Sequence, residues 1–128
     1  KFCWPAPSYT RISSPYGWRN HPIFKTQKFH SGVDLAAPGG TNILAAESGT
    51  VKFAGWNGGY GNCLIIDHGG GITTLYGHAS KLCVSKGEYV TKGSVVAKVG
   101  TTGNSTGNHL HFEVLINGKT TDPMAYIK

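Results

Sequence analysis

The sequence predicts an all-β domain with antiparallel sheets, a barrel-sandwich hybrid with little helix and with long loops that border a groove. Glycine makes up 19 of the 128 residues, about twice its usual share. Runs of strong helix formers are scarce. Short apolar segments alternate with glycine-rich turns, and Asn117-Gly118 is a strong signal for a two-residue hairpin. We expect no helix longer than about two turns.

The first 29 residues are expected to form an irregular arm with turns. Their prolines are spaced among aromatic residues, a composition typical of loops (Pro5, Pro7, Pro15 and Pro22). His21 precedes Pro22 and has no partner at metal-ligand spacing, so we interpret it as a loop residue. An extended segment with His30 and Asp34 follows, because Gly32 and β-branched Val33 disfavour a helix there.

The rest of the chain reads as short strands joined by tight turns. His68 lies in a glycine-rich turn, so we expect it to be solvated and without a functional role. His78 ends a strand between Gly77 and Ala79, small residues that leave room around its imidazole. The predicted strands are 43–46, 50–54, 63–67, 72–78, short segments within 84–100, and 109–116; the main loops are 55–61 and 100–107.

The strand that begins at His109 carries the clearest chemical signal. Alternate residues of a strand share a face, so His109 and His111 point one way while Leu110, Phe112 and Val114 point the other. Even spacing along extended chain likewise places His30 and Asp34 on one face.

Together these segments offer three imidazoles and a carboxylate. Two histidine nitrogens and one carboxylate oxygen are a donor set that zinc accepts, with a fourth position left open. Zinc lowers the pKa of a water in such a position to about 7, which suits hydrolysis.

The net charge and the short apolar runs of the chain limit the kinds of partner that it is expected to bind. The net charge of +6 favours polyanionic surroundings, but the basic residues are scattered singly, so we do not expect nucleic-acid binding. No apolar run approaches the ~18 residues of a membrane span, so we expect no membrane contact by this domain. The chain starts at Lys1 without a signal peptide, and we expect a domain excised from a longer secreted or membrane-anchored protein.

The three cysteines form no zinc-finger pattern and no disulfide framework. Cys63 and Cys83 lie among aliphatic residues and suit small buried hydrophobic positions. A bond between these two is compatible with the sequence, and Cys3 could be free or pair outside this stretch.

Three motifs, in order along the chain, resemble the signature set of the LytM/lysostaphin-type zinc metallopeptidases, which cut peptide bonds in bacterial peptidoglycan. They are His30-x-x-x-Asp34, Tyr76-Gly77-His78 and the stretch 105–114 around His109-Leu110-His111. The likeness extends from about Arg11 to the end of the chain. It implies a single peptidase domain over 1–128, with 1–10 as an N-terminal arm, and the duplicated hybrid motif fold with its substrate groove.

The resemblance also implies roles for individual residues. His30, Asp34 and His111 would bind one zinc ion, and His78 and His109 would be catalytic histidines beside the open position. One would act as general base and the other would stabilise the oxyanion or protonate the leaving amine. Which residue does which stays open, as does the bond that is cut.

The resemblance makes peptidoglycan peptides the expected substrate. The protein would act as a monomer outside the cytoplasm, secreted or at the cell surface, in a bacterium or phage. The main alternative is a non-catalytic wall-binding or regulatory module on the same fold, although unpaired buried His and Asp are costly without a metal. The turns of 84–100 also resemble lipoyl and biotinyl carriers, but no carrier lysine can be named.

Overall fold

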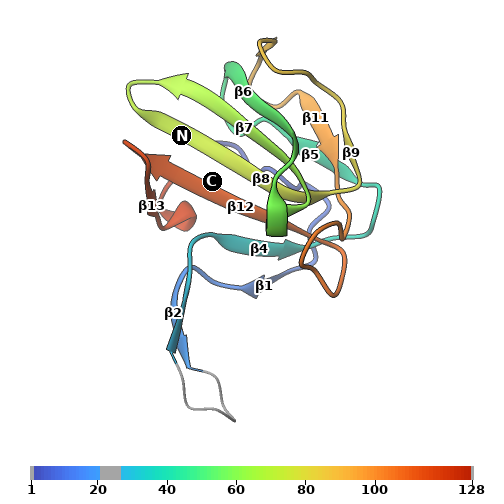
Figure 1. Cartoon of the computed structure of the whole chain (residues 1–128), viewed down its shortest axis with the longest axis vertical. Coiled ribbons are helices and arrows are strands. Elements are labelled where there is room, and N and C mark those ends of the chain that lie inside the picture. The colour runs from blue at the N-terminus through green and yellow to red at the C-terminus, as the bar shows by residue number, and fades with distance from the viewer. Residues whose placement is uncertain (1, 21–26, 128) are drawn as a thin grey trace.

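The structure, a computed structural model, describes residues 2–20 and 27–127 (Figure 1). The strands are β1 (Arg11–Ser14), β2 (Gly17–Asn20), β3 (Gln27–His30), β4 (Val33–Ala36), β5 (Asn42–Leu44), β6 (Gly49–Trp56), β7 (Asn62–Gly69), β8 (Ile72–Ala79), β9 (Lys81–Leu82), β10 (Tyr89–Val90), β11 (Val95–Lys98), β12 (His109–Ile116) and β13 (Lys119–Thr121). Helix within this part of the chain is limited to two 3₁₀ turns, η1 (Gly58–Tyr60) and η2 (Pro123–Ala125). The all-β class is therefore confirmed.

The strands form one large antiparallel sheet and two small ones. The large sheet has the order β1-β4-β12-β8-β7-β6-β10, with β13 paired to the end of β12. A three-stranded sheet, β5-β11-β9, packs behind it, and β2 and β3 form a separate hairpin that extends away from both (Figure 1). Strand β12 lies between β4 and β8, so its residues are held from both sides. None of the helices in the described residues is long and apolar enough to cross a membrane.

The core lies between the large and the three-stranded sheets. Leu110 and Phe112 from β12 are fully buried, and the Phe112 ring lies 5.3 Å from that of Tyr76 in β8. Ile43 of β5 and Val96 of β11 close the same cluster from the other side. Because the apolar side chains of β12 are buried on one face, the alternate side chains of the strand project from the opposite face.

Two predicted hairpins are confirmed by backbone geometry. Asn117 and Gly118, with φ of 52° and 80°, join β12 to β13. Gly70 and Gly71, with φ of 63° and 82°, join β7 to β8. Positive φ at both central residues gives a turn whose twist matches that of the flanking strands.

The N-terminal arm is more regular than its composition predicted. Strand β1 pairs with the edge of β4, and β2 pairs with β3. Near the start of the chain, Phe2 is buried and forms a parallel bridge with Ile127. Pro15 lies between β1 and β2 and interrupts neither strand, so part of an arm of unfavourable composition still forms paired strands.

Two expectations about single residues were wrong. Cys83 is exposed, because it follows the partly buried Leu82 and alternation turns its side chain outward. His68 is not freely solvated: its ring nitrogens lie 2.9 Å from the Ser48 carbonyl oxygen and 2.8 Å from Thr74 Oγ1.

The three thiols are free, so Cys63 and Cys83 are not bonded to each other. Cys63 is buried as expected, and burial raises the pKa of its thiol to about 11. It therefore behaves as a small apolar residue of the core.

Candidate functional site

The site is built on three neighbouring strands of the large sheet. His111 in β12 lies opposite Asp34 in β4 on one side and opposite Gly77 in β8 on the other. Opposed residues of antiparallel strands project from the same face, so strand pairing alone brings His111 and Asp34 together. His109 shares this face with His111, as alternation predicted.

Gly77 provides space for this row. A Cβ atom at Gly77 would lie 3.3 Å from Tyr60 Cδ1 and 3.5 Å from His111 Cβ. The small residue that is expected to leave room around His78 thus also leaves room for His111 and Tyr60.

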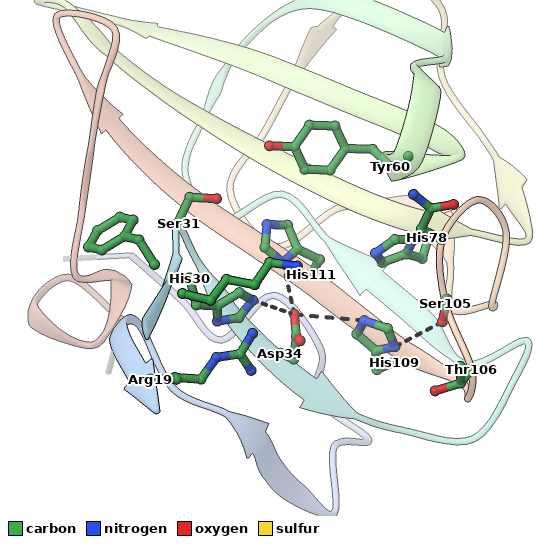
Figure 2. Close-up of a pocket in the computed structure, with 14 residues that line it drawn as sticks. Arg19, His30, Ser31, Asp34, Tyr60, His78, Ser105, Thr106, His109 and His111 are labelled. Carbon is green, nitrogen blue, oxygen red and sulfur yellow. Dashed lines mark hydrogen bonds and ion pairs between the residues drawn. The ribbon is translucent and has the colours of Figure 1, made fainter. Parts of the chain in front are cut away.

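Three candidate ligands converge at Asp34 (Figure 2). The donor atoms of His30, Asp34 and His111 all lie within 4.8 Å of one another. Asp34 Oδ1 is 2.8 Å from His111 Nδ1 and 3.4 Å from His30 Nε2. The structure thus brings together the three residues that the resemblance named as metal ligands.

Glu113 is a site residue that the sequence analysis missed. Its side chain is nearly fully buried, and its Oε2 accepts hydrogen bonds from three groups on three segments. These are His111 Nε2 at 2.8 Å, the Tyr60 hydroxyl at 2.7 Å and the Ser31 hydroxyl at 2.7 Å. Alternation along β12 could have found it, because Glu113 follows His111 by two residues on the same face.

This network orients the His111 ring. With Nε2–H donated to Glu113, Nδ1 faces Asp34 and is the nitrogen available to a metal. Outer carboxylates of this kind commonly fix the tautomer of a ligating histidine.

The two carboxylates also decide the charge of His111. Burial alone would lower its pKa, but hydrogen bonds to Asp34 and Glu113 raise it to about 9. Burial would raise the pKa of Asp34, yet hydrogen bonds from His111 and His30 hold it below its usual range. Without a metal, the site therefore holds an imidazolium between two carboxylates at neutral pH.

His30 reaches the site by a bend, not by the continuous extended chain that its spacing suggested. Strand β3 ends at His30, and β4 begins at Val33. A Cβ atom at Gly32 would lie 2.4 Å from the Phe112 carbonyl oxygen, so only glycine lets the bend pass this close to β12. His30 Nδ1 donates to the Pro15 carbonyl oxygen at 2.9 Å, which directs Nε2 toward Asp34.

His78 and His109 form a second pair of imidazoles beside the three candidate ligands. Their ring centroids are 4.7 Å apart. His78 Nδ1 donates to the Thr102 carbonyl oxygen at 2.7 Å, and His109 Nδ1 donates to the Gly107 carbonyl oxygen at 2.8 Å. Each ring therefore directs Nε2 away from its carbonyl partner; His78 Nε2 has no hydrogen-bond partner among the described residues, and His109 Nε2 lies 3.7 Å from Asp34 Oδ1.

His78 has an unusual backbone and a shifted pKa. Its φ of 65° lies in the left-handed region that non-glycine residues rarely adopt. Burial lowers its pKa below the ordinary value of 6.5, against the opposing effect of the Thr102 hydrogen bond. His78 is therefore a neutral imidazole at physiological pH, and strain of this kind gathers at functional sites.

The side chains of Asp34 and of the four histidines described above line one cavity of about 470 Å³ (Figure 2). Its other walls come from the arm hairpin, the loop around η1 and the loop before β12 (Arg19, Lys28, Phe29, Ser31, Gly59, Tyr60, Asn104, Ser105 and Thr106). A second hollow of about 240 Å³ shares Asp34, Thr106 and His109 with the first. The two hollows therefore adjoin at these three residues. His21 lies outside the described residues.

The donor set suits a zinc ion. Two imidazole nitrogens and a carboxylate oxygen converge, and the second nitrogen of each ring is already bonded, to Pro15 and to Glu113. Zinc sites that keep an open position are built in this way.

Comparison with known proteins gives the same picture. Residues 28–123 match Peptidase family M23. The chain is 49% identical over 117 residues to the DD-carboxypeptidase/endopeptidase Mpg of Neisseria meningitidis, covering 91% of this chain and 27% of that protein. The chain thus spans about a quarter of the length of this relative.

Solved structures share the fold. A zinc-containing peptidase from Vibrio cholerae is 36% identical with a TM-score of 0.89, over 96% of this chain and 39% of that one. The antimicrobial peptidase lysostaphin from Staphylococcus simulans is 34% identical with a TM-score of 0.80, over 93% and 49%. On its sequence, its fold and the donor residues that the fold brings together, the chain belongs to peptidase family M23.

Proposed function

We propose that this chain is a zinc-dependent endopeptidase domain that hydrolyses peptide bonds of bacterial peptidoglycan, in a cross-link or a stem peptide. The observation that carries the proposal is the convergence of His30, Asp34 and His111 beside two further imidazoles that line the same cavity and are each oriented through Nδ1 by a backbone carbonyl. A relative named DD-carboxypeptidase/endopeptidase and a zinc-containing peptidase of the same fold support the peptidase chemistry, and a relative from Vibrio cholerae named peptidoglycan DD-endopeptidase ShyA supports the substrate. Two adjoining hollows that share Asp34 suit a chain that is cut internally.

His30, Asp34 and His111 would hold one zinc ion. When bound there, zinc supplies a Lewis acid that lowers the pKa of an attacking water. His78 and His109 handle the protons. One Nε2 accepts the proton of the attacking water, and the other donates to the developing oxyanion or to the leaving amine. The carbonyl acceptors at Thr102 and Gly107 keep both rings aimed into the cavity throughout.

We propose that residues 1–128 form a single peptidase domain that acts as a monomer. A peptidoglycan substrate places it outside the cytoplasm, secreted or at the cell surface. Nucleic acid and membrane are not expected partners of this domain. A net charge of +6 suits an anionic wall.

Digestion of purified peptidoglycan tests the proposal. Zinc-loaded protein should release new peptide amines, and a chelator should abolish their release. Mass spectrometry of the new termini would identify the bond that is cut. Walls with several cross-link chemistries belong in the same experiment. If no wall is cut while zinc is bound stoichiometrically, the non-catalytic wall-binding function takes its place.

A further inference from the structure

Two cations stand side by side on the wall of the groove. Arg19 in β2 lies directly opposite Lys28 in β3. Residues opposed across an antiparallel pair project from the same face, and His30 lies two residues further along β3 on that face. The face of the hairpin that presents His30 to Asp34 therefore also presents Arg19 and Lys28.

Nothing in the described residues neutralises this pair. Both side chains line the 470 Å³ cavity, and Asp34 is the one carboxylate among the cavity's lining residues in the part of the chain that is described. Asp34 is itself committed to three imidazoles. Of the ion pairs found among residues 2–20 and 27–127, none includes Arg19 or Lys28. Like charges placed opposite each other are unfavourable unless an anion bridges them.

Arg19 is also held in place. Its guanidinium donates to the hydroxyl of Ser14, whose side chain is buried. Figure 2 shows Arg19 on the same side of the cavity as His30 and Asp34. A guanidinium that is already fixed loses less conformational entropy when it binds an anion.

We propose that Arg19 and Lys28 form a subsite that binds a carboxylate of the peptide substrate near the bond that is cut. Two residues of strand separate Lys28 from His30, roughly 7 Å. The bound carboxylate would therefore lie within about two residues of the reacting carbonyl. This inference rests on the proposed peptidase function, and it adds a charge requirement for the substrate.

Matched synthetic peptides test the subsite. One carries both a C-terminal and a side-chain carboxylate near the scissile bond, a second has the C-terminus amidated, and a third has the side chain amidated. Zinc-loaded wild type should cleave the free-acid peptide with a kcat/KM roughly tenfold above that of one of the two amidated peptides. The amidation that causes this loss identifies the carboxylate that is bound.

Charge-removing variants then locate the effect. Lys28→Gln and the double variant Arg19→Gln/Lys28→Gln should lose the preference for the free-acid peptide, because the KM for that peptide rises. Both variants should cleave the peptide in which the recognised carboxylate is amidated at the wild-type rate. Raising the salt concentration should raise the KM of the free acid in wild type and not in the double variant. Lys52→Gln/Lys86→Gln removes the same charge from exposed positions outside the cavity and should keep the preference.

The outcomes are distinct. Equal cleavage of acid and amides by wild type, or a preference that survives in the double variant, would overturn the subsite. If neither peptides nor peptidoglycan are cut by zinc-loaded wild type, the proposed function fails, and calorimetry with the same uncut peptides tests the subsite alone. Zinc content close to one equivalent in each variant shows that a lost preference is not a lost metal site.

Discussion

His111 and His30 face the same site but are held in different ways. His111 lies on a strand paired on both sides, its side chain is 7% exposed, and its two nitrogens are hydrogen-bonded to Asp34 and Glu113. His30 ends a strand of a separate two-stranded sheet and is oriented by a single backbone carbonyl, that of Pro15. Two-stranded hairpins are of marginal stability by themselves.

The same contrast extends to the surrounding residues. The large sheet supplies Asp34, His78 and His109 from paired strands, whereas the hairpin supplies Arg19, Lys28 and exposed aromatics. Next to the hairpin, the Tyr16 hydroxyl donates to the Thr120 carbonyl oxygen of the large sheet at 3.2 Å. We infer that the sheet fixes the geometry of the chemistry, and that the hairpin selects the substrate.

The largest effect is expected at Asp34, where the sheet and the hairpin meet. Asp34→Ala removes one donor and leaves His30 and His111 without their shared carboxylate. Zinc affinity should fall by more than the 10- to 100-fold typical of a lost outer partner, and peptidase activity should be abolished. Zinc content after dialysis checks this. If the variant retained a full equivalent of zinc, the assignment of Asp34 as a metal ligand would be wrong.

Next in size is the loss of His78, one of the two imidazoles that are proposed to be catalytic. His78→Ala should retain zinc, because His78 is not among the three converging donors, yet kcat should fall about 10²- to 10⁴-fold. Steady-state kinetics together with metal analysis separates the two properties. Activity within a few fold of the parent would reject the catalytic role.

The outer carboxylate on β12 comes third. Glu113→Gln should keep the shape of the network but weaken the hydrogen bond from His111, so zinc affinity should fall about 10- to 100-fold. Competition with a zinc chelator measures this. Glu88→Gln, at an exposed glutamate far along the chain, is the matched control. Equal affinity in both variants would show that Glu113 does not support the metal site.

Zinc binding should also depend on pH. The pKa of His111 is raised to about 9 in the metal-free site, so a proton must leave before Nδ1 can bind a metal. Zinc affinity should rise about tenfold per pH unit from pH 7 toward 9. Calorimetry in buffers of different ionisation enthalpy should detect the released proton at pH 7.

The stability of the metal-free protein should fall over the pH range in which zinc affinity rises. Because folding raises the pKa of His111 from 6.5 to about 9, its contribution to the stability of the metal-free protein is complete below pH 6.5. It is lost as the pH rises through about 9. Thermal melts of metal-free protein that do not change over this range would contradict the shift.

The smallest effect belongs to the hairpin. Trp18→Ala should change the free energy of unfolding by less than about 0.5 kcal/mol, because the side chain is 69% exposed. Leu110→Ala in the core of β12 should lower it by about 2–5 kcal/mol. Urea denaturation compares the two. A Trp18 effect as large as that of Leu110 would mean that the hairpin is part of the folding core.

Local patterns account for the parts of the fold that were predicted correctly. The turns at 70–71 and 117–118 depend on residues that accept positive φ, and the two faces of β12 depend on alternation. Strands β1 to β3 were missed because each has four residues and β1 gains its order from a distant partner: Arg11, for example, pairs with Ala36. Composition cannot show such a pairing.

For the site, the sequence by itself singled out the residues that are proposed to carry the chemistry. It placed His109 and His111 on one face, and its motifs singled out His30, Asp34 and His78. Only the tertiary structure decided how these groups are oriented. Glu113 accepts hydrogen bonds from Ser31, 82 residues away in the chain, and from Tyr60, 53 residues away. Its hydrogen bond with His111 Nε2 leaves Nδ1 of that ring facing Asp34. Local periodicity sets the face of a strand, whereas the partner of each ring nitrogen depends on packing between segments that are far apart in the chain.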